Sequence, residues 1–236
     1  MSRVSPPAEF LESLARHGVA ADERTLAALG GYLGRLLATN EDLNLTAVRD
    51  ADIAWTKHLA DSLSLAPHLR PLAPGRVLDL GSGGGLPGIP LAIAFPEVGF
   101  TLVDARAKKV AFLADVAREL GLSNVTALAD RAEALAARGS PHREAYDVVL
   151  ARAVAPMPVL LELAIPFLRV GGHLLAIKGE RYAEELAAAA KALAILETDV
   201  ASTTRTETGT IVVLRKHART PPKYPRRPGE PKKSPL

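Results

Sequence analysis

The chain has 236 residues, 48% of them hydrophobic, which is enough for one large domain or for a domain with a small appendage. Cysteine is absent, so a disulfide framework, a thiolate metal site and a cysteine nucleophile are excluded, and no metal ligand is assigned. No apolar run reaches the length of about 18 residues that spans a bilayer, and the N-terminal stretch lacks a signal-peptide core. We therefore expect a cytoplasmic protein with no membrane partner.

The formal charge of +3 is unevenly distributed. From Arg215 onward, eight lysines and arginines face one acid, Glu230, which leaves +7 there and −4 in the rest of the chain. The proline-rich residues 218–236 cannot build a core, and two interpretations stay open. They form either a disordered, solubilising tail or an arm that binds a polyanion such as nucleic acid, with Arg226 and Arg227 as candidate contacts.

Residues 1–74 read as a helical subdomain packed on the rest. Apolar residues recur at helical spacing, and residues suited to helix caps stand between the periodic segments. The predicted elements are a helix around residues 10–14 that ends at Gly18, a helix from Asp22 to Leu37, a loop over residues 40–48, and a helix opened by Asp50 or Asp52 that reaches about residue 65.

Residues 75–217 alternate between short apolar runs and helical patterns, which predicts a mostly parallel sheet with helices on both faces. The predicted strands lie in residues 76–81, 99–105, 125–129, 147–153, 173–179, 195–202 and 210–218, and the predicted helices in residues 89–94, 108–120, 157–168 and 182–193.

The last two predicted strands are separated by only about six residues. A parallel crossover needs about a dozen or more, so these two strands must pair antiparallel. The fold class is thus α/β, with a seven-stranded, mostly parallel sheet that contains one antiparallel strand.

A glycine-rich turn follows the first strand, in the stretch VLDLGSGGGLPGIPLA. Its pattern is D-x-G-x-G-x-G, formed by Asp79, Gly81, Gly83 and Gly85. Glycine permits a positive φ and removes the Cβ, so a ligand can lie against the backbone. A turn between a strand and a helix is where a nucleoside cofactor binds in such sheets.

The residues around the turn distinguish between cofactors. A phosphate-binding P-loop needs Gly-Lys-Ser/Thr, where this chain has Leu86-Pro87, and a dinucleotide fold needs a small residue where Leu86 stands. S-adenosylmethionine (AdoMet) has no pyrophosphate and needs a bare backbone and an acceptor for its ribose. Asp104 ends the second strand and is placed for that ribose, although it would also suit NAD. The reversed strand favours a Rossmann-like class I AdoMet-dependent methyltransferase.

The string GSGGGLPGIPLAI resembles the RsmG (GidB) family of bacterial 16S rRNA (guanine-N7)-methyltransferases. Further segments fit the same family in the expected order: NLTAV at 44–48, HLADSL at 58–63, ARAVAP at 151–156, IKG at 177–179 and YPRRPG at 224–229. The resemblance implies methyl transfer from AdoMet to N7 of the guanine at nucleotide 527 of 16S rRNA. The partner would be 16S rRNA or the 30S subunit, including an assembly intermediate, and we expect a monomer.

The resemblance also implies cofactor contacts at Gly81, Leu86, Ala132, Glu133 and Arg152. Asp79, Gly83, Gly85 and Asp104 join this set from the glycine pattern and the strand-end geometry. Candidate RNA contacts are Lys178 at the end of the fifth strand and, more weakly, Asn44 and His58, which suit a loop cap and a helix histidine equally well.

Guanine N7 carries a lone pair and no proton, so its attack on a sulfonium methyl group needs no general base, and orientation supplies much of the catalysis. Arg152, at the end of the fourth strand, is the candidate catalytic residue. It would bind the methionyl carboxylate, an RNA phosphate or guanine O6. Two other functions stay open: a NAD(P)-linked oxidoreductase, and a non-catalytic rRNA-binding or assembly factor with a vestigial cofactor pocket.

Overall fold

A computed structural model describes residues 5–236 of the chain. Its centre is one seven-stranded sheet with the strand order β3-β2-β1-β4-β5-β7-β6. The strands are β1 (Arg76–Leu80), β2 (Gly99–Asp104), β3 (Val125–Ala129), β4 (Tyr146–Arg152), β5 (Leu168–Lys178), β6 (Thr198–Arg205) and β7 (Thr210–Lys216).

Strands β1 to β5 are parallel, and β7 lies antiparallel between β5 and β6. The hairpin predicted from the short spacing of the last two strands is therefore confirmed. The sheet as a whole matches the predicted fold class, with the chain order reversing next to β1. Such a reversal is where open α/β sheets bind their ligands, outside the carboxyl ends of the strands.

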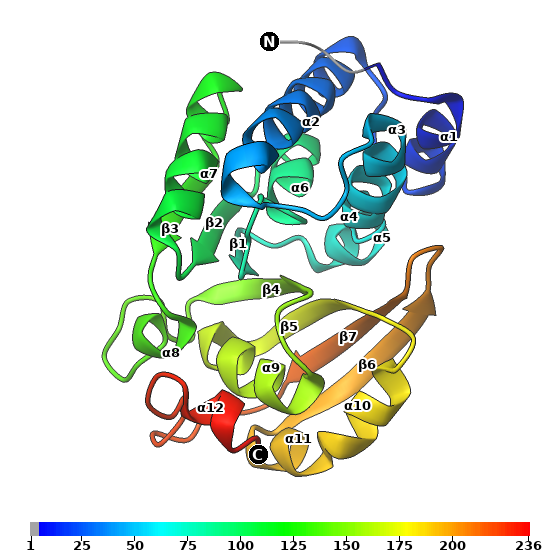
Figure 1. Ribbon diagram of the computed structural model, residues 1–236. Coiled ribbons are helices and arrows are strands. Elements are labelled where there is room, and N and C mark those ends of the chain that lie inside the picture. The colour runs from blue at the N-terminus through cyan, green and yellow to red at the C-terminus, as the bar shows by residue number, and fades with distance from the viewer. Residues whose placement is uncertain (1–4) are drawn as a thin grey trace.

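Helices cover both faces of the sheet (Figure 1). One face is covered by α1 (Ala8–Arg16), α2 (Glu23–Leu43), α3 (Ala51–Ala54), the π-helical turn η1 (Trp55–Ala60), α4 (Asp61–Leu63), α5 (Ala66–Leu69), α6 (Gly88–Ala94) and α7 (Ala107–Glu119). The other carries α8 (Ala132–Leu135), α9 (Met157–Ala164), α10 (Tyr182–Ala188), α11 (Ala190–Ile195) and α12 (Glu230–Lys233). Two short 3-10 turns, η2 (Arg70–Leu72) and η3 (Ile165–Phe167), join these elements.

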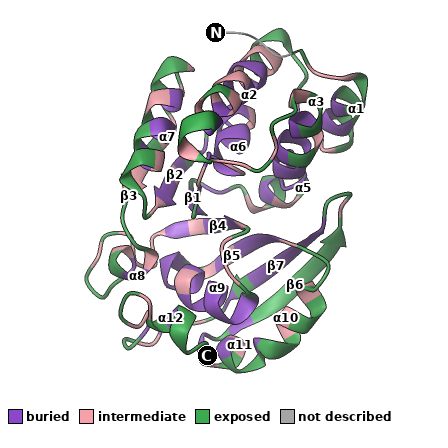
Figure 2. Cartoon of the chain, viewed as in Figure 1, coloured by how far each residue is buried: buried purple, intermediate pink, exposed green. Residues whose placement is uncertain are grey.

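Alternate residues along the central strands enter two separate cores. Val77 and Val148 face the N-terminal helices, whereas Leu78 and Val149 face α9. All four side chains are fully buried, and Figure 2 shows the central strands largely buried between the two helical layers. The N-terminal helices thus share one side of the sheet's packing with α6 and α7. No helix within residues 5–236 is both long and apolar enough to cross a membrane.

Local signals predicted several boundaries correctly. Asp22 accepts a hydrogen bond from the amide of Thr25 at the start of α2, and Asp50 does the same for Ile53 at the start of α3. Gly18 follows α1 with φ +64°. Other boundaries were wrong: α2 continues to Leu43 into the predicted loop, and the helix predicted over 157–168 ends at Ala164, because β5 already begins at Leu168. The helix predicted over 182–193 is interrupted at Ala189, and β6 begins only at Thr198. Helices α5, α8 and α12 were not predicted.

The basic C-terminal residues are packed on the body of the protein. Tyr224 is buried, with 5% of its surface exposed, and Pro231 is also buried. Arg143 donates hydrogen bonds to the carbonyl oxygens of Tyr224 and Thr220, at 2.7 and 3.0 Å. The sequence left two interpretations open for these residues, a disordered tail and an arm that binds a polyanion. The structure does not show a disordered tail.

Candidate functional site

The glycine-rich turn joins β1 to α6 at the carboxyl edge of the sheet. Gly81, Gly83 and Gly85 have φ values of +70°, +56° and +98°, which other residues rarely adopt. A Cβ at Gly83 would meet no atom closer than 3.8 Å, apart from its chain neighbours. Of these three glycines, Gly83 is therefore the one with open space beside it.

The other glycines are required largely by packing within the protein. A Cβ at Gly84 would lie 2.8 Å from Leu36 of α2, and one at Gly85 would lie 2.7 Å from Ile89. At Gly88 it would lie 2.3 Å from Leu102. The expectation that the glycines all make room for a ligand is therefore only partly right, because several of them make room for the core.

Asp79, near the end of β1, is completely buried. Its Oδ2 accepts a hydrogen bond from the amide of Gly88 at 3.0 Å, but its Oδ1 has no hydrogen-bond partner among residues 5–236. Burial raises the pKa of Asp79 to about 7, against the opposing effect of the Gly88 and Ser82 hydrogen bonds. A buried carboxylate oxygen without a partner is costly, which favours the protonated form of this side chain and accounts for the raised pKa.

Asp104 ends β2 and reaches across to the glycine-rich turn. Its Oδ2 accepts a hydrogen bond from the amide of Gly83 at 3.1 Å, and its Oδ1 accepts one from the backbone amide of Arg106 at 2.8 Å. Each carboxylate oxygen keeps a further lone pair. The half-buried side chain can therefore hold the turn and still accept a hydrogen bond from a ribose hydroxyl.

Ala132 and Glu133 open α8, which follows β3 at the same edge of the sheet. Glu133 has 6% of its surface exposed, and its Oε1 accepts hydrogen bonds from Arg131 at 2.9 Å and from the amide of Gly229 at 2.8 Å. Burial opposes ionisation of this carboxyl, but these hydrogen bonds outweigh it and hold its pKa below the usual value. The side chain is thus engaged within the protein, and a cofactor would meet the α8 backbone. Leu86 is half-buried against the N-terminal helices.

Arg152 ends β4 and lies among side chains from the N-terminal helices. Its Nη1 is 3.0 Å from Oδ2 of Asp61, as an ion pair that is not aligned as a hydrogen bond. Its Nη2 lies 3.0 Å from Nδ1 of His58. The hydroxyl of Thr208, from the β6–β7 turn, donates a hydrogen bond to Oδ1 of Asp61. The η1–α4 segment therefore holds the guanidinium through Asp61 and His58, and the β6–β7 turn supports Asp61.

His58 is the neutral member of this arrangement. Burial, with help from the nearby Arg152 charge, lowers its pKa to about 4. Its Nε2 lies 2.5 Å from the hydroxyl of Thr46. Its Nδ1 lies 3.0 Å from the carbonyl oxygen of Lys57 as well as from Arg152, so three polar partners hold the ring in place. The sequence analysis assigned no role to Thr46, Asp61 or Thr208, although the first two lie in segments that resemble the family.

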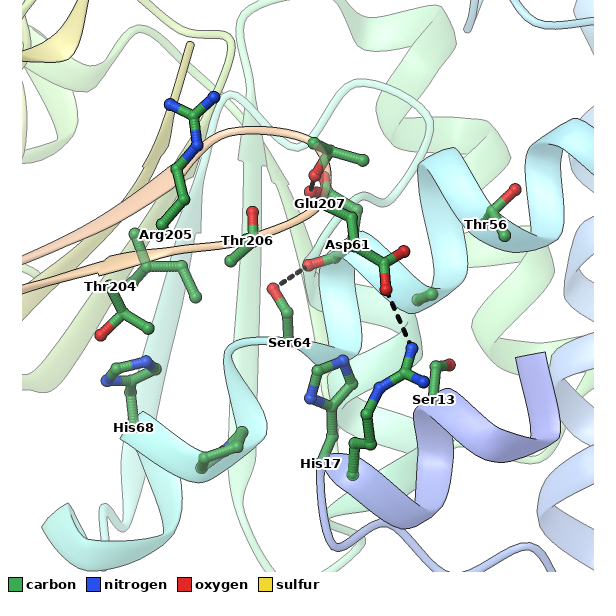
Figure 3. Close-up of a pocket in the computed structure, with 15 residues that line it drawn as sticks. Ser13, His17, Thr56, Asp61, Ser64, His68, Thr204, Arg205, Thr206 and Glu207 are labelled. Carbon is green, nitrogen blue, oxygen red and sulfur yellow. Dashed lines mark hydrogen bonds and ion pairs between the residues drawn. The ribbon is translucent and has the colours of Figure 1, made fainter. Parts of the chain in front are cut away.

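A hollow of about 770 Å³ opens beside Arg152, at the carboxyl ends of β4 and β5. A second hollow of about 440 Å³ lies between α1, the η1–α5 region and the β6–β7 turn (Figure 3). Asp61, Glu207 and Thr208 line both hollows. The ion pair between Arg16 and Glu207, at 2.9 Å, joins α1 to the hairpin turn beside the second hollow.

The candidate RNA contacts are scattered and differ in availability. Asn44 is exposed and ends α2 with φ +49°. Lys178 lies in the wall of the larger hollow, but it pairs with Glu185 at 2.6 Å and donates to the carbonyl oxygen of Ala155. Arg226 pairs with the fully buried Glu162, whereas Arg227 is exposed. The structure thus gives Lys178 and Arg226 partners within the protein, and their RNA roles stay predictions.

Comparisons with known proteins agree with this architecture. Two curated relatives are both named ribosomal RNA small subunit methyltransferase G. The one from Sorangium cellulosum is 48% identical over 95% of this chain and 93% of its own length, and the one from Limosilactobacillus fermentum is 44% identical over 98% of each.

Solved structures show the same fold at low sequence identity. The O-methyltransferase TomG from Streptomyces achromogenes, in complex with SAM, superposes with a TM-score of 0.57 at 14% identity and covers 92% of this chain and 100% of its own. An O-methyltransferase from Bacillus cereus, in complex with SAH, gives 0.57 at 15% identity and covers 87% and 96%. The fold is that of the class I AdoMet-dependent methyltransferases.

The family model described as rRNA small subunit methyltransferase G matches residues 25–213, which include most of α2, strands β1 to β6 and the first half of β7. With the Asp79 turn, the Asp104 strand end and the Arg152 hollow gathered at one edge of the sheet, the chain belongs to the GidB family of rRNA small subunit methyltransferases.

Proposed function

We propose that this protein uses AdoMet to methylate N7 of the guanine at nucleotide 527 of 16S rRNA. The family and its named relatives support rRNA as the substrate, and the class I fold supports AdoMet as the methyl donor. The choice of a guanine N7 follows from the family resemblance together with the chemistry of the hollow beside Arg152.

The observation that carries the proposal is that the carboxylates and the histidine lining this hollow, the groups that could act as a base, already have partners within the protein. Asp61 is bound by Arg152 and Thr208, and Glu185 by Lys178. Glu207 is bound by Arg16, and His58 by Arg152 and Thr46. These side chains are poorly placed to remove a proton. An unprotonated nucleophile such as guanine N7 needs no such base, so the hollow suits it better than an amine or a hydroxyl.

The residues of the chain divide the work of binding and orientation. Asp79 would accept the ammonium of the cofactor, and Asp104 would accept its ribose hydroxyls. The backbone at Gly81, Gly83 and Ala132 would line it. AdoMet supplies an electrophilic methyl group bound to a sulfonium centre. Arg152, fixed by Asp61 and His58, would orient the guanine through O6 and leave N7 free, and correct orientation alone can lower a barrier substantially.

The partner in this proposal is 16S rRNA or the 30S subunit, including an assembly intermediate, bound by a monomer of the protein. Arg227 and the exposed Asn44 are the available candidates for RNA contact. His58 faces the hollow as part of its wall.

Mass spectrometry of 16S rRNA nucleosides tests the proposal directly. A strain without the gene should lack 7-methylguanosine at nucleotide 527, and purified protein with labelled AdoMet should restore it on deficient 30S subunits or rRNA. Labelled methyl on an exocyclic amine, or no transfer despite AdoMet binding, would refute the proposal. Binding of NADH in place of AdoMet would instead indicate an oxidoreductase.

A further inference from the structure

We propose that residues 220–236, here called the C-terminal clasp, form part of the scaffold that positions α8 for the cofactor. The sequence suggested an arm for RNA that would be independent of the cofactor. The inference rests on the proposed function in one respect, namely that the α8 backbone at Ala132 and Glu133 contacts AdoMet.

The first anchor of the clasp is a buried ion pair. Glu162 of α9 is completely buried, and its carboxylate is bound by Arg226. Nε of Arg226 lies 2.8 Å from Oε1 and Nη2 lies 2.5 Å from Oε2, while the amide of Arg226 donates to Oε1 at 2.9 Å. The body of the protein therefore contains a buried carboxylate whose hydrogen bonds all come from the clasp, and leaving such a charge unpaired is strongly destabilising.

The second anchor reaches α8 itself. The amide of Gly229 donates a hydrogen bond of 2.8 Å to Oε1 of Glu133, in the first turn of that helix. Gly229 has φ +85°, a conformation that a residue with a Cβ adopts only with strain. The position of this amide, and thus its bond to Glu133, depends on the glycine.

A third contact joins the other end of α8 to the clasp. Nη1 of Arg143 donates to the carbonyl oxygens of Ala136, directly after α8, and of Tyr224 in the clasp, at 3.0 and 2.7 Å. Helix α8 has four residues and no side-chain cap at its start. Its orientation is therefore fixed at both ends by contacts that include the clasp.

The charges of the clasp fall into two groups. Arg226 faces inward, whereas Arg227, Lys232 and Lys233 are exposed. A role in positioning α8 and a role in RNA binding therefore reside in different residues, and variants can separate them.

The first test uses the wild-type protein and hydrogen exchange. Because coupling between two sites is reciprocal, AdoMet should slow amide exchange in peptides covering residues 224–230 as well as in the glycine-rich turn and residues 130–137. Protection of the turn and α8 without any change in the clasp would overturn the proposal.

The second test compares variants by calorimetry with AdoMet. Arg226→Ala removes the anchor on Glu162, and Gly229→Ala disturbs the hydrogen bond to Glu133. Each variant should weaken AdoMet binding about fivefold to tenfold and raise KM with little change in kcat. The matched control Arg227→Ala/Lys232→Ala/Lys233→Ala removes more charge from the same segment. It should leave AdoMet affinity within about twofold while it flattens the salt dependence of RNA binding.

Folded Arg226→Ala and Gly229→Ala variants, judged by circular dichroism and melting, with wild-type AdoMet affinity would overturn the proposal. If Arg226→Ala does not fold, Gly229→Ala and the exchange experiment decide. A failure of the proposed function looks different: AdoMet binding would respond to the clasp as expected, but no methyl group would reach guanine N7.

Discussion

The hydroxyl of Tyr32, in the middle of α2, donates a hydrogen bond of 2.8 Å to the carbonyl oxygen of Gly84 in the glycine-rich turn. The phenol is completely buried, and burial raises its pKa well above the usual value, so it remains a donor. Leu36 follows one turn further along α2, and its side chain would lie only 2.8 Å from a Cβ on Gly84. An N-terminal helix thus shapes the glycine-rich turn, where we propose that the cofactor binds.

We therefore expect Tyr32→Phe to weaken AdoMet binding about fivefold to tenfold, since a buried hydrogen bond contributes about 0.5–1.5 kcal/mol. The loss should appear in KM for AdoMet, with kcat nearly unchanged at saturation. Tyr146→Phe is the matched control, because this buried tyrosine also loses a hydrogen bond, to His142 at 2.7 Å. Tyr146 begins β4, at the edge of the sheet opposite the glycine-rich turn. Equal affinity losses in both variants would mean that the effect is general destabilisation.

Substitutions at two glycines of the turn should separate binding from folding. Gly83→Asp places a carboxylate next to Asp104 without a steric clash, so AdoMet binding should be lost, while the positive φ at this position lowers the melting temperature by only a few degrees. Gly88→Ala forces a methyl group against Leu102 and Asp79, and we expect a loss of about 1–3 kcal/mol in unfolding free energy, typical of overpacking. Calorimetry and urea unfolding give the two quantities. Wild-type affinity in Gly83→Asp would show that the turn does not hold the cofactor.

Arg152→Ala should affect both stability and turnover. Asp61 has a side chain only 4% exposed, and burial raises its pKa even with Arg152 beside it. Removing Arg152 leaves this carboxylate without its ion pair, at a cost on the order of 3 kcal/mol. Turnover at saturating AdoMet should fall on the order of 100-fold, because the proposed guanine substrate would lose its orientation.

The double variant Asp61→Asn/Arg152→Ala distinguishes these two effects. It should regain much of the lost stability, measured by urea unfolding, since the unpaired charge is gone. Methyl transfer should stay low. Recovery of turnover together with stability would mean that Arg152 acts only as a partner for Asp61.

The pKa of Asp79, about 7, predicts how AdoMet binding depends on pH. Below this pH the carboxyl is protonated in the free protein, and the ammonium of AdoMet favours the ionised form. Affinity should therefore rise from about pH 5.5 to 7.5 and then level off, with proton release near pH 6.5 that calorimetry in two buffers measures. Asp79→Asn should weaken binding and remove this dependence. A pH-independent wild-type affinity would contradict the assignment.

The raised pKa of Asp79 should also make the protein without AdoMet less stable as the pH rises. Its folded-state pKa is raised from 3.8, so the folded protein keeps a proton that the unfolded chain releases between about pH 4 and 7. The stability advantage is present below pH 4 and lost as the pH rises through 7. His58 changes stability in the other direction, because its pKa is lowered to about 4 and its contribution is lost as the pH falls from 6.5 to 4. Comparing melting curves of wild type and Asp79→Asn isolates the Asp79 effect.

The sequence predicted those parts of the fold that depend on local rules. The caps at Asp22 and Asp50 follow from side chains that bind nearby amides, and the antiparallel β6–β7 pair follows from loop length alone. The π-helical turn between α3 and α4 carries no such local signal. Its position depends on packing of the buried Trp55 and Leu59.

The arrangement of the site was less predictable because its contacts join distant segments. Arg152 stood out as a strand-end arginine, but its partner Asp61 lies 91 residues earlier and reaches it only because η1 and α4 pack over the sheet. Glu133 and Gly229 are 96 residues apart. The glycine pattern correctly indicated a turn with positive φ values, but no sequence rule shows that Leu36 and Leu102 occupy the space beside it.

The place of β7 in the sheet has a consequence for how the chain folds during synthesis. Strand β7 is made after every other strand, yet it lies between β5 and β6 and pairs with both. Until the ribosome releases it, the edge of β5 exposes a row of unpaired amides and carbonyls, and Glu162 has no Arg226 to neutralise it. An open edge of this kind can template pairing with another chain. Nascent chains that stall before residue 210 are therefore the ones most exposed to aggregation and most in need of a chaperone.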